Sequence, residues 1–379
     1  MARSSYGDSL SKRALSLYES YPQVKKWHDE LSVLKTLRTA QGYTDSLAGF
    51  IDDVKKNPDE LVKLNGEEAY ELLRGWAIQK RKTGSITDGR ISLIWFAVKS
   101  FFKLHKIRID GDFPFSKMRV KYLDKIPTKQ DLKRILQTAP SLATKIAIQL
   151  MAYSGLRPED ICDLTYSSIK HDFEKDVSPC AAYIPQSKSD EVYVTFIPES
   201  TIVLLKQYFK LRKNKGEEII DSSPVYRSQQ SDEPGGIRRK TLTQNIENTL
   251  KKSGIELSTS FGSKIQRMRP YSLRKYFRSN LAGHVPIEFA EAWTGHTSGL
   301  AQIYNGARDL DPTTIERMRR TYRDVEKHLL VEGLDEDQIV QRIFHDEEMK
   351  KRDEMMIQLT EKLAEATERL EELERKLSK

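Results

Sequence analysis

The chain has 379 residues, of which 38% are apolar and 31% charged, and this composition predicts a globular protein with two or three domains and a sizeable core. It contains no apolar run of membrane-spanning length and no leader with a charged start and an apolar middle. We therefore expect an intracellular, cytoplasmic protein with no membrane partner. Its two cysteines, Cys162 and Cys180, exclude a disulfide framework, and no Cys/His spacing resembles a zinc site.

The net charge of +8 is unevenly distributed along the chain. Residues 332–379 hold 15 acidic and nine basic residues, a net charge of −6, which leaves +14 for the rest. A basic body favours a nucleic-acid partner, because polyanion binding is driven by phosphate neutralisation and counterion release. Solubility alone is the simpler alternative.

Pattern and composition divide the chain into four expected parts. These are a helical domain (1–115), a linker rich in turn residues (116–127), a mixed domain (128–331) and an acidic helical tail (332–379). The expected fold class is therefore mainly α with a small antiparallel sheet.

The first expected domain shows clear helix signals. Asn65 is a plausible N-cap and Gly84 a stop for one helix, and the next helix carries one apolar stripe. The stripe is more typical of a core than of a binding surface, and it comprises Ile91, Ile94, Trp95, Val98, Phe101, Phe102 and His105. Thr128 predicts the N-cap of the first helix after the linker.

In the mixed domain, an apolar helix is expected to end at Gly155. Two strands, Ala182 to Pro185 and Val192 to Ile197, are expected around a polar turn. Three helices are expected after them, starting near Thr201, Thr241 and Ser272.

The tail carries an a/d heptad seam with charged residues around it. The seam consists of Met356, Leu359, Leu363, Ala366, Leu370, Leu373 and Leu377. It predicts either a short coiled coil that pairs subunits or a helix packed on its own body.

Chemistry-bearing residues occur at four places in the mixed domain. Arg157 follows Gly-Leu at the end of the apolar helix, with Asp160 three residues on, and its planar fork suits two phosphate oxygens. An ion pair between these two residues is the structural alternative. Lys188 lies in the turn between the two strands and is either an ordinary turn lysine or a cation that can give up a proton.

The third place is a predicted helix start, where Arg274 lies one turn beyond Tyr271. Plain phosphate binding would also explain basic residues on this helix. The fourth place is "AWTGHTSGLAQIYNGAR", in which His296 is followed eight residues later by Tyr304, in a polar stretch punctuated by glycine. A structural tyrosine is more typical of a periodic apolar run.

Taken in order, these residues resemble the active-site set of the tyrosine recombinase family, which includes phage integrases and Xer recombinases. "SGLRPEDICDL" is similar to the family's Gly-Leu-Arg motif, "RPYSLRKYFRSNL" to its His-x-x-Arg helix start, and "WTGHTSGLAQIY" to its Gly-His…Tyr motif. The resemblance spans about residues 120–310, and more weakly the helical region before it. Two features depart from the pattern: Tyr271 replaces the usual histidine, and the interval from His296 to Tyr304 is one residue shorter than is common.

The resemblance implies a helical core-binding domain followed by a catalytic domain that cuts and rejoins DNA without metal or ATP. The nucleophile would be Tyr304, which would form a 3′-phosphotyrosyl link, and Lys188 would protonate the leaving 5′ oxygen. The remaining site residues implied are Arg157, Arg274, His296 and Tyr271 around the phosphate, with Asp160 in support. The implied partner is double-stranded DNA, which the protein would bind as a homotetramer at the recombination sites of a mobile element.

In the first domain, a basic turn and helix suggest contacts to the DNA backbone. The residues concerned are Lys80, Arg81, Lys82, Arg90 and Lys99. Three alternatives remain open from the sequence: a type IB topoisomerase, a non-catalytic DNA-binding relative weakened at Tyr271, and a basic coiled-coil scaffold.

Overall fold

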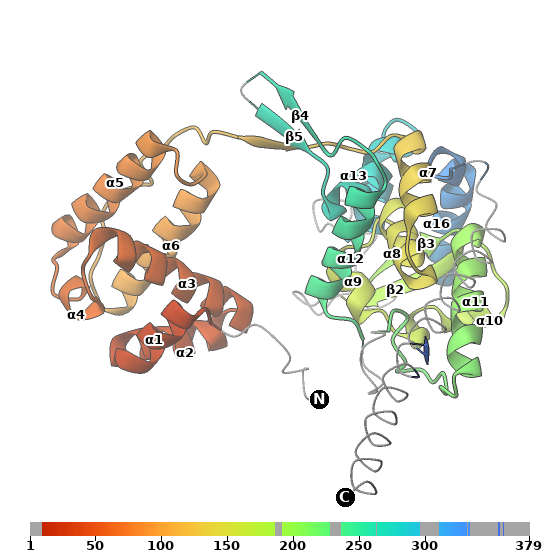
Figure 1. Ribbon diagram of the computed structural model, residues 1–379, viewed down its shortest axis with the longest axis horizontal. Coiled ribbons are helices and arrows are strands. Elements are labelled where there is room, and N and C mark those ends of the chain that lie inside the picture. The colour runs from red at the N-terminus through yellow and green to blue at the C-terminus, as the bar shows by residue number, and fades with distance from the viewer. Residues whose placement is uncertain are drawn as a thin grey trace, which may run out of the picture. The chain divides into compact units, whose positions relative to one another are not determined.

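The structure is a computed structural model, and it describes residues 10–185, 192–227, 236–262, 264–295, 311–331, 333, 355–356 and 359. The chain divides into two compact units, residues 1–123 and 124–379, each with its own apolar core. The division lies within the segment 116–127 that is expected to be a linker. Figure 1 colours the first unit from red to orange and most of the second from yellow to blue.

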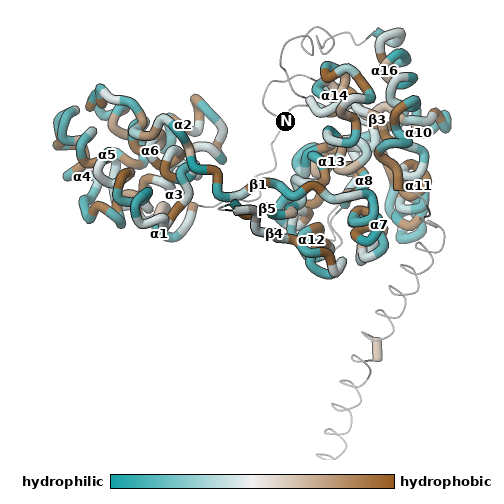
Figure 2. The backbone as a smooth tube through the Cα atoms, turned by 90° about the horizontal axis from the view of Figure 1, so that it is seen from above, coloured by the Kyte–Doolittle hydropathy of each residue, from teal (hydrophilic) through white to brown (hydrophobic). Residues whose placement is uncertain are grey.

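The N-terminal unit is mainly helical. Its elements are α1 (Lys12–Ser20), α2 (Pro22–Leu34), α3 (Leu37–Val54), α4 (Pro58–Leu61), α5 (Gly66–Thr83) and α6 (Asp88–Leu104). Helix α3 packs against α1, α2 and α6. Both units show alternating brown and teal stretches along their helices in Figure 2, as amphipathic helices around a core should.

Local capping explains where α5 begins and ends. The Asn65 side chain accepts from the Glu68 backbone N–H at 2.9 Å, and the Glu68 carboxylate accepts from the Asn65 N–H at 3.0 Å. Gly84 ends the helix in the left-handed conformation with φ of +62°. The predicted cap and stop are both confirmed.

The apolar stripe of α6 is confirmed as core. Its aliphatic and aromatic members are at most 5% exposed, and Trp27 of α2 packs edge-on against Phe101. His105 is the C-cap of α6, at the end of the stripe.

The second unit is mainly helical with short strands. Its helices are α7 (Lys129–Thr138), α8 (Leu142–Tyr153), α9 (Pro158–Asp163), α10 (Lys170–Glu174), α11 (Glu199–Asn214), α12 (Arg239–Lys252), α13 (Pro270–Leu281), α14 (Ile287–Trp293) and α16 (Pro312–Val325), with short 3₁₀ turns at Tyr166–Ser168 and Glu326–His328. The expected fold class, mainly α with a small antiparallel sheet, is confirmed. Among the described residues, no helix is both long and apolar enough to cross a membrane.

Helix α8 is the centre of this unit, because all 12 of its residues are buried. It packs against α13, α11 and α9, which surround it in Figure 1. The predicted N-cap Thr128 is confirmed at the start of α7, where its hydroxyl accepts from the Asp131 N–H at 3.1 Å.

The described strands form two small sheets. Strands β2 (Cys180–Pro185) and β3 (Val192–Ile197) pair antiparallel, which confirms the expected hairpin, with β2 starting two residues earlier. A second sheet has the order β1 (Tyr122–Asp124), β5 (Lys264–Arg267) and β4 (Ser258–Phe261). The sequence did not predict the β4–β5 hairpin, because these strands are short and largely polar.

The expected heptad tail lies almost wholly outside the described residues. Of its seam, Met356 and Leu359 are described, both helical and more than half exposed. The other seam positions are not described.

Candidate active site

The site begins where α8 ends. Gly155 has φ of +66°, and a Cβ at this position would lie 2.6 Å from the Phe277 ring of α13. Both the left-handed backbone and the close approach therefore require glycine. The turn redirects the chain into Arg157, the N-cap residue of α9.

Arg157 contacts Asp160 and Gly295 and keeps part of its side chain exposed. Its backbone N–H donates to Asp160 Oδ2 at 2.8 Å, and its Nη1 lies 3.8 Å from the same oxygen. Its Nη2 donates to the Gly295 carbonyl at 3.4 Å. The side chain is 29% exposed, so part of the guanidinium remains accessible to a ligand. The alternative of an Arg157–Asp160 ion pair is therefore also realised, as a long contact.

Arg274 approaches the same place from α13. It is 1% exposed and donates to the carbonyls of Gly155 and Thr294. Burial lowers the pKa of Arg274, and the positive charge of Arg157 lowers it further. Two neighbouring guanidinium groups repel each other, and a phosphate between them would relieve that repulsion.

Asp160 connects this pair of arginines to the β2–β3 hairpin. The Tyr193 hydroxyl of β3 donates to Asp160 Oδ2 at 2.6 Å. Tyr193 is 1% exposed and is absent from the sequence expectations. The contact joins residues 33 positions apart, so no local pattern could have indicated it.

Tyr271 lies on the first turn of α13, three residues before Arg274, and is 41% exposed. Residues three apart on a helix share a face, so the phenol and the guanidinium lie on neighbouring positions of α13.

Lys188, His296 and Tyr304 lie outside the described residues. The described residues stop at Pro185, before Lys188, and start again at Val192. They stop again at Gly295, directly before His296. Gly295, the residue directly before His296, contacts Arg157 through its carbonyl.

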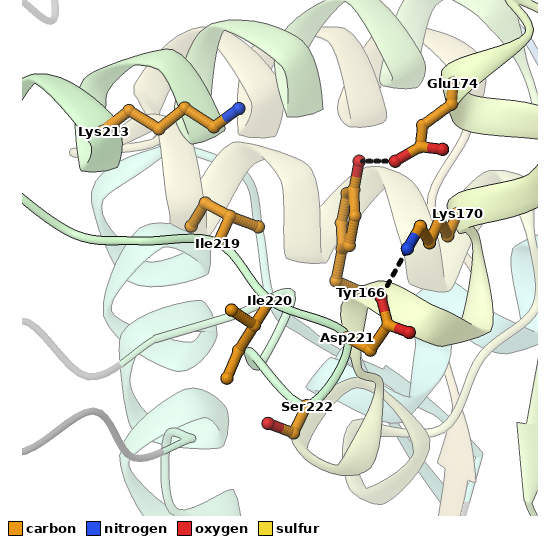
Figure 3. Close-up of a pocket in the computed structure, with 8 residues that line it drawn as sticks. All are labelled: Tyr166, Lys170, Glu174, Lys213, Ile219, Ile220, Asp221 and Ser222. Carbon is orange, nitrogen blue, oxygen red and sulfur yellow. Dashed lines mark hydrogen bonds and ion pairs between the residues drawn. The ribbon is translucent and has the colours of Figure 1, made fainter.

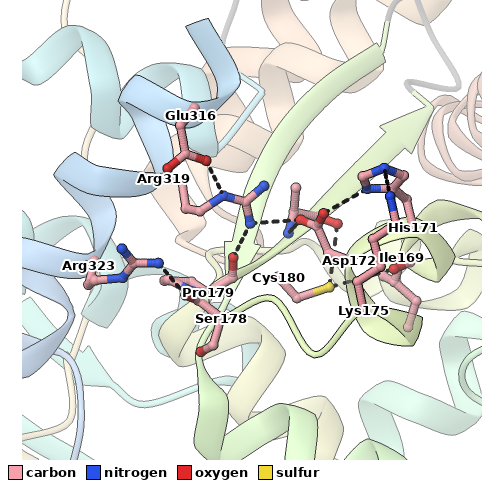
Figure 4. Close-up of polar contacts among 11 residues, drawn as sticks. Ile169, His171, Asp172, Lys175, Ser178, Pro179, Cys180, Glu316, Arg319 and Arg323 are labelled. Carbon is pink, nitrogen blue, oxygen red and sulfur yellow. Dashed lines mark hydrogen bonds and ion pairs between the residues drawn. The ribbon is translucent and has the colours of Figure 1, made fainter. Parts of the chain in front are cut away.

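The described chain resumes at Asp311 and forms α16. Arg319 of this helix is buried, and it donates to Asp172 Oδ2 at 2.7 Å and to the Pro179 carbonyl, as Figure 4 shows. Arg323 donates to the Ser178 carbonyl one turn later. The helix after the Tyr304 segment is thus held on the start of β2.

One open pocket, of about 560 Å³, lies apart from these arginines. Figure 3 shows two pairs among its polar groups: Tyr166 donates to Glu174 at 3.1 Å, and Lys170 donates to Asp221 at 2.8 Å. Polar groups that are paired with one another do not by themselves indicate a ligand. Within the described parts of the chain, no cluster of His, Cys, Asp and Glu could hold a metal ion.

The basic residues expected to contact DNA differ in their surroundings. Lys80 pairs with Asp53 at 2.7 Å, and Lys99 donates to the Gly111 carbonyl at 2.9 Å. Arg81 lies over the Phe115 ring, 4.1 Å from its centroid, and pairs with Asp88 at 3.2 Å. Lys82 and Arg90 are exposed.

Comparisons with known proteins identify the class. Residues 125–309 match the model of the Phage integrase family. The tyrosine recombinase XerA of Pyrococcus horikoshii is 23% identical over 217 residues, covering 56% of this chain and 68% of the relative. XerA of Pyrococcus furiosus is 22% identical over 240 residues, covering 62% and 75%.

Solved structures share the fold at low identity. A XerH site-specific recombinase bound to palindromic difH substrate covers 83% of this chain and 90% of its own, with 14% identity and a TM-score of 0.52. A lambda integrase tetramer bound to a Holliday junction covers 77% and 83%, with 16% identity and a TM-score of 0.51.

Over residues 125–309, the family match and the curated relatives, together with the ordered motifs, place this chain in the phage integrase family. It is a tyrosine recombinase, an enzyme that breaks and rejoins DNA. The resemblance drawn from the motifs is confirmed.

Proposed function

We propose that this recombinase cuts and rejoins specific DNA sites through a 3′-phosphotyrosyl intermediate on Tyr304, and that it integrates or excises a mobile element. The observation that carries the proposal is the convergence of Arg157 and Arg274 on the carbonyls of Thr294 and Gly295. These carbonyls directly precede His296 in the sequence, so the two cations lie at the point where the segment leading to the proposed nucleophile begins.

The two arginines stabilise the charge that develops on phosphorus during attack. The pentavalent transition state carries more negative charge than the phosphodiester, and preorganised donors stabilise such charge strongly. Arg274 is fixed by burial, whereas Arg157 is partly accessible. We assign Arg274 to one non-bridging oxygen and Arg157 to the other.

The remaining chemistry is proton transfer and orientation. Lys188 donates the proton that the leaving 5′ oxygen needs, and His296 hydrogen-bonds the phosphate. Tyr271, on the exposed first turn of α13, donates its phenolic hydrogen to the phosphate in place of an imidazole. The phosphotyrosyl link keeps the energy of the phosphodiester bond, so the 5′ hydroxyl of another strand can reverse it. None of these steps calls for a metal ion or ATP.

DNA binding uses both units in this proposal. Lys82 and Arg90 are exposed and serve as phosphate contacts from the N-terminal unit. Lys80, Arg81 and Lys99 already have protein partners and contribute mainly to the field around the DNA. We further propose a homotetramer on two DNA sites, supported by the lambda integrase tetramer on a Holliday junction.

A plasmid assay tests the proposal. Supercoiled plasmids carrying repeated sequences from the DNA that flanks the gene are incubated with the protein without metal or ATP. The proposal predicts a covalent protein–DNA adduct and exchange between matched sites. Relaxation on every plasmid without exchange would instead indicate a topoisomerase, and DNA binding without any adduct would indicate a non-catalytic relative.

A further inference from the structure

One face of strand β3 contacts the loop that carries Arg157. Tyr193 and Thr195 are two residues apart, so their side chains leave the same face of the strand. The Tyr193 hydroxyl donates to Asp160 Oδ2 at 2.6 Å, and the Thr195 hydroxyl donates to the Ser154 carbonyl at 2.7 Å. The two contacts therefore hold both ends of the loop from Ser154 to Asp160.

A single carboxylate oxygen links the strand to the arginine. Asp160 Oδ2 accepts from Tyr193 and from the Arg157 backbone N–H, and it lies 3.8 Å from Arg157 Nη1. Rotation of this carboxylate would therefore alter both the backbone and the guanidinium of Arg157. The Tyr193 hydroxyl holds this oxygen from strand β3, outside the loop.

The environment keeps Tyr193 protonated as a donor. Burial raises the pKa of Tyr193 well above the usual value of a phenol, and the negative charge of Asp160 raises it further. The ring is packed in the core, where a hydrogen bond to a carboxylate is among the stronger neutral-to-charged contacts.

We propose that Tyr193 is a positioning residue of this recombinase: through Asp160 it fixes the Arg157 guanidinium where the scissile phosphate binds. This inference rests on the proposed function, because it assigns Arg157 to the phosphate. Tyr193 itself does not touch DNA, and its effect is confined to the orientation of Arg157. Removing the hydroxyl lets the carboxylate rotate, and small misplacements of a catalytic group have large effects on rate.

The test compares Tyr193→Phe with a matched control, Tyr166→Phe. Phenylalanine keeps the ring in each case and removes a hydroxyl that donates to a carboxylate, Asp160 in one and Glu174 in the other. Tyr166 belongs to the same unit but lines the pocket of Figure 3. Single-turnover cleavage is measured at saturating DNA, together with DNA affinity and thermal unfolding.

Tyr193→Phe should slow cleavage by about 10- to 100-fold, while DNA affinity changes less than about threefold. The control should cleave within about twofold of the wild type. In an Arg157→Ala background, Tyr193→Phe should cause no further loss, because the group it positions is gone. An equal loss in that background would show that Tyr193 acts through general stability, and would overturn the proposal.

A substrate with sulfur at the 5′-bridging position tests whether Tyr193 acts on leaving-group protonation instead of on Arg157. Strand β3 follows the segment that contains Lys188, so the alternative is that Tyr193 acts on leaving-group protonation. A thiolate leaves without a proton, and the proposal predicts that Tyr193→Phe stays slow on this substrate. Rescue by sulfur, or wild-type cleavage by Tyr193→Phe on normal DNA, would overturn the role of Tyr193 alone. Absence of any adduct with the wild-type protein would instead refute the proposed function.

Discussion

The two described arginines differ in burial although they share one proposed ligand. Arg274 is 1% exposed, and Arg157 has a side chain that is 29% exposed. Replacing either with Ala should cost about 3 kcal/mol of transition-state stabilisation, roughly 100-fold in cleavage rate, as the loss of one oxyanion donor does. Single-turnover cleavage measures this loss. DNA affinity should fall much less, because many basic residues share binding. An alanine variant that cleaves at the wild-type rate would remove that arginine from the site.

Lys188 is proposed as the acid for the leaving 5′ oxygen. Lys188→Ala should therefore be slow on normal DNA and largely restored on DNA with a 5′-bridging sulfur, since a thiolate leaves readily. Cleavage rates on the two substrates give the comparison. If sulfur fails to restore cleavage, Lys188 contributes to DNA contact only.

At the scale of elements, the anchor of α16 is a buried ion pair. Arg319 and Asp172 have side chains 8% and 5% exposed, with Nη1 and Oδ2 2.7 Å apart. Removing one partner of such a pair leaves an uncompensated buried charge, so Arg319→Met should cost about 3–5 kcal/mol of unfolding free energy. Arg320→Met is the control, because Arg320 is 74% exposed and its pair with Glu316 is worth at most about 1 kcal/mol. Urea unfolding of both variants measures the two changes in unfolding free energy. Equal losses would contradict this account of α16.

The same pair gives a pH dependence with a defined sign. Burial alone would raise the pKa of Asp172, but hydrogen bonds from the Ala181 N–H, His171 and Arg319 outweigh burial and lower it. A carboxyl with a lowered pKa in the folded state stabilises the protein above the ordinary carboxyl value and loses that contribution as the pH falls. The loss should therefore set in below about pH 4 and be smaller in Arg319→Met.

Local patterns predicted the elements that carry their own signals. The β2–β3 hairpin was expected from two apolar runs around a polar turn, and α5 from its cap at Asn65 and its stop at Gly84. The β4–β5 hairpin was missed because strands such as Lys264–Arg267 lack an apolar alternation. A strand of this kind is stabilised by pairing with its neighbours, which sequence patterns do not show.

The site was only partly accessible from sequence for a similar reason. The motif order indicated Arg157 and Arg274. Both have local signals, because Arg157 follows a Gly-Leu pair and Arg274 lies near a helix start. The Tyr193–Asp160 contact spans 33 residues and the Arg319–Asp172 contact 147, and neither has a spacing rule. Long-range contacts of this kind depend on tertiary packing, which a single sequence does not reveal.

On the scale of the whole molecule, the tail and the remainder of the chain carry opposite net charges. The tail from residue 332 carries a net charge of −6, so DNA should repel it. Deleting residues beyond 345 should leave covalent trapping of one site intact while it changes recombination yield between two sites. Three heptads predict weak, concentration-dependent self-association, which sizing with and without DNA can measure. If the full-length and truncated proteins assemble and recombine identically, the heptad seam contributes only to local packing.

The central claim is that Tyr304 attacks the scissile phosphate. The most direct measurement compares wild-type protein with Tyr304→Phe on a nicked DNA site that traps the covalent intermediate, followed by denaturing electrophoresis and peptide mapping. The account predicts an adduct on Tyr304 for the wild type, and none for the Phe variant despite unchanged DNA binding. An adduct formed by the Phe variant, or one that maps to another tyrosine in the wild type, would contradict it.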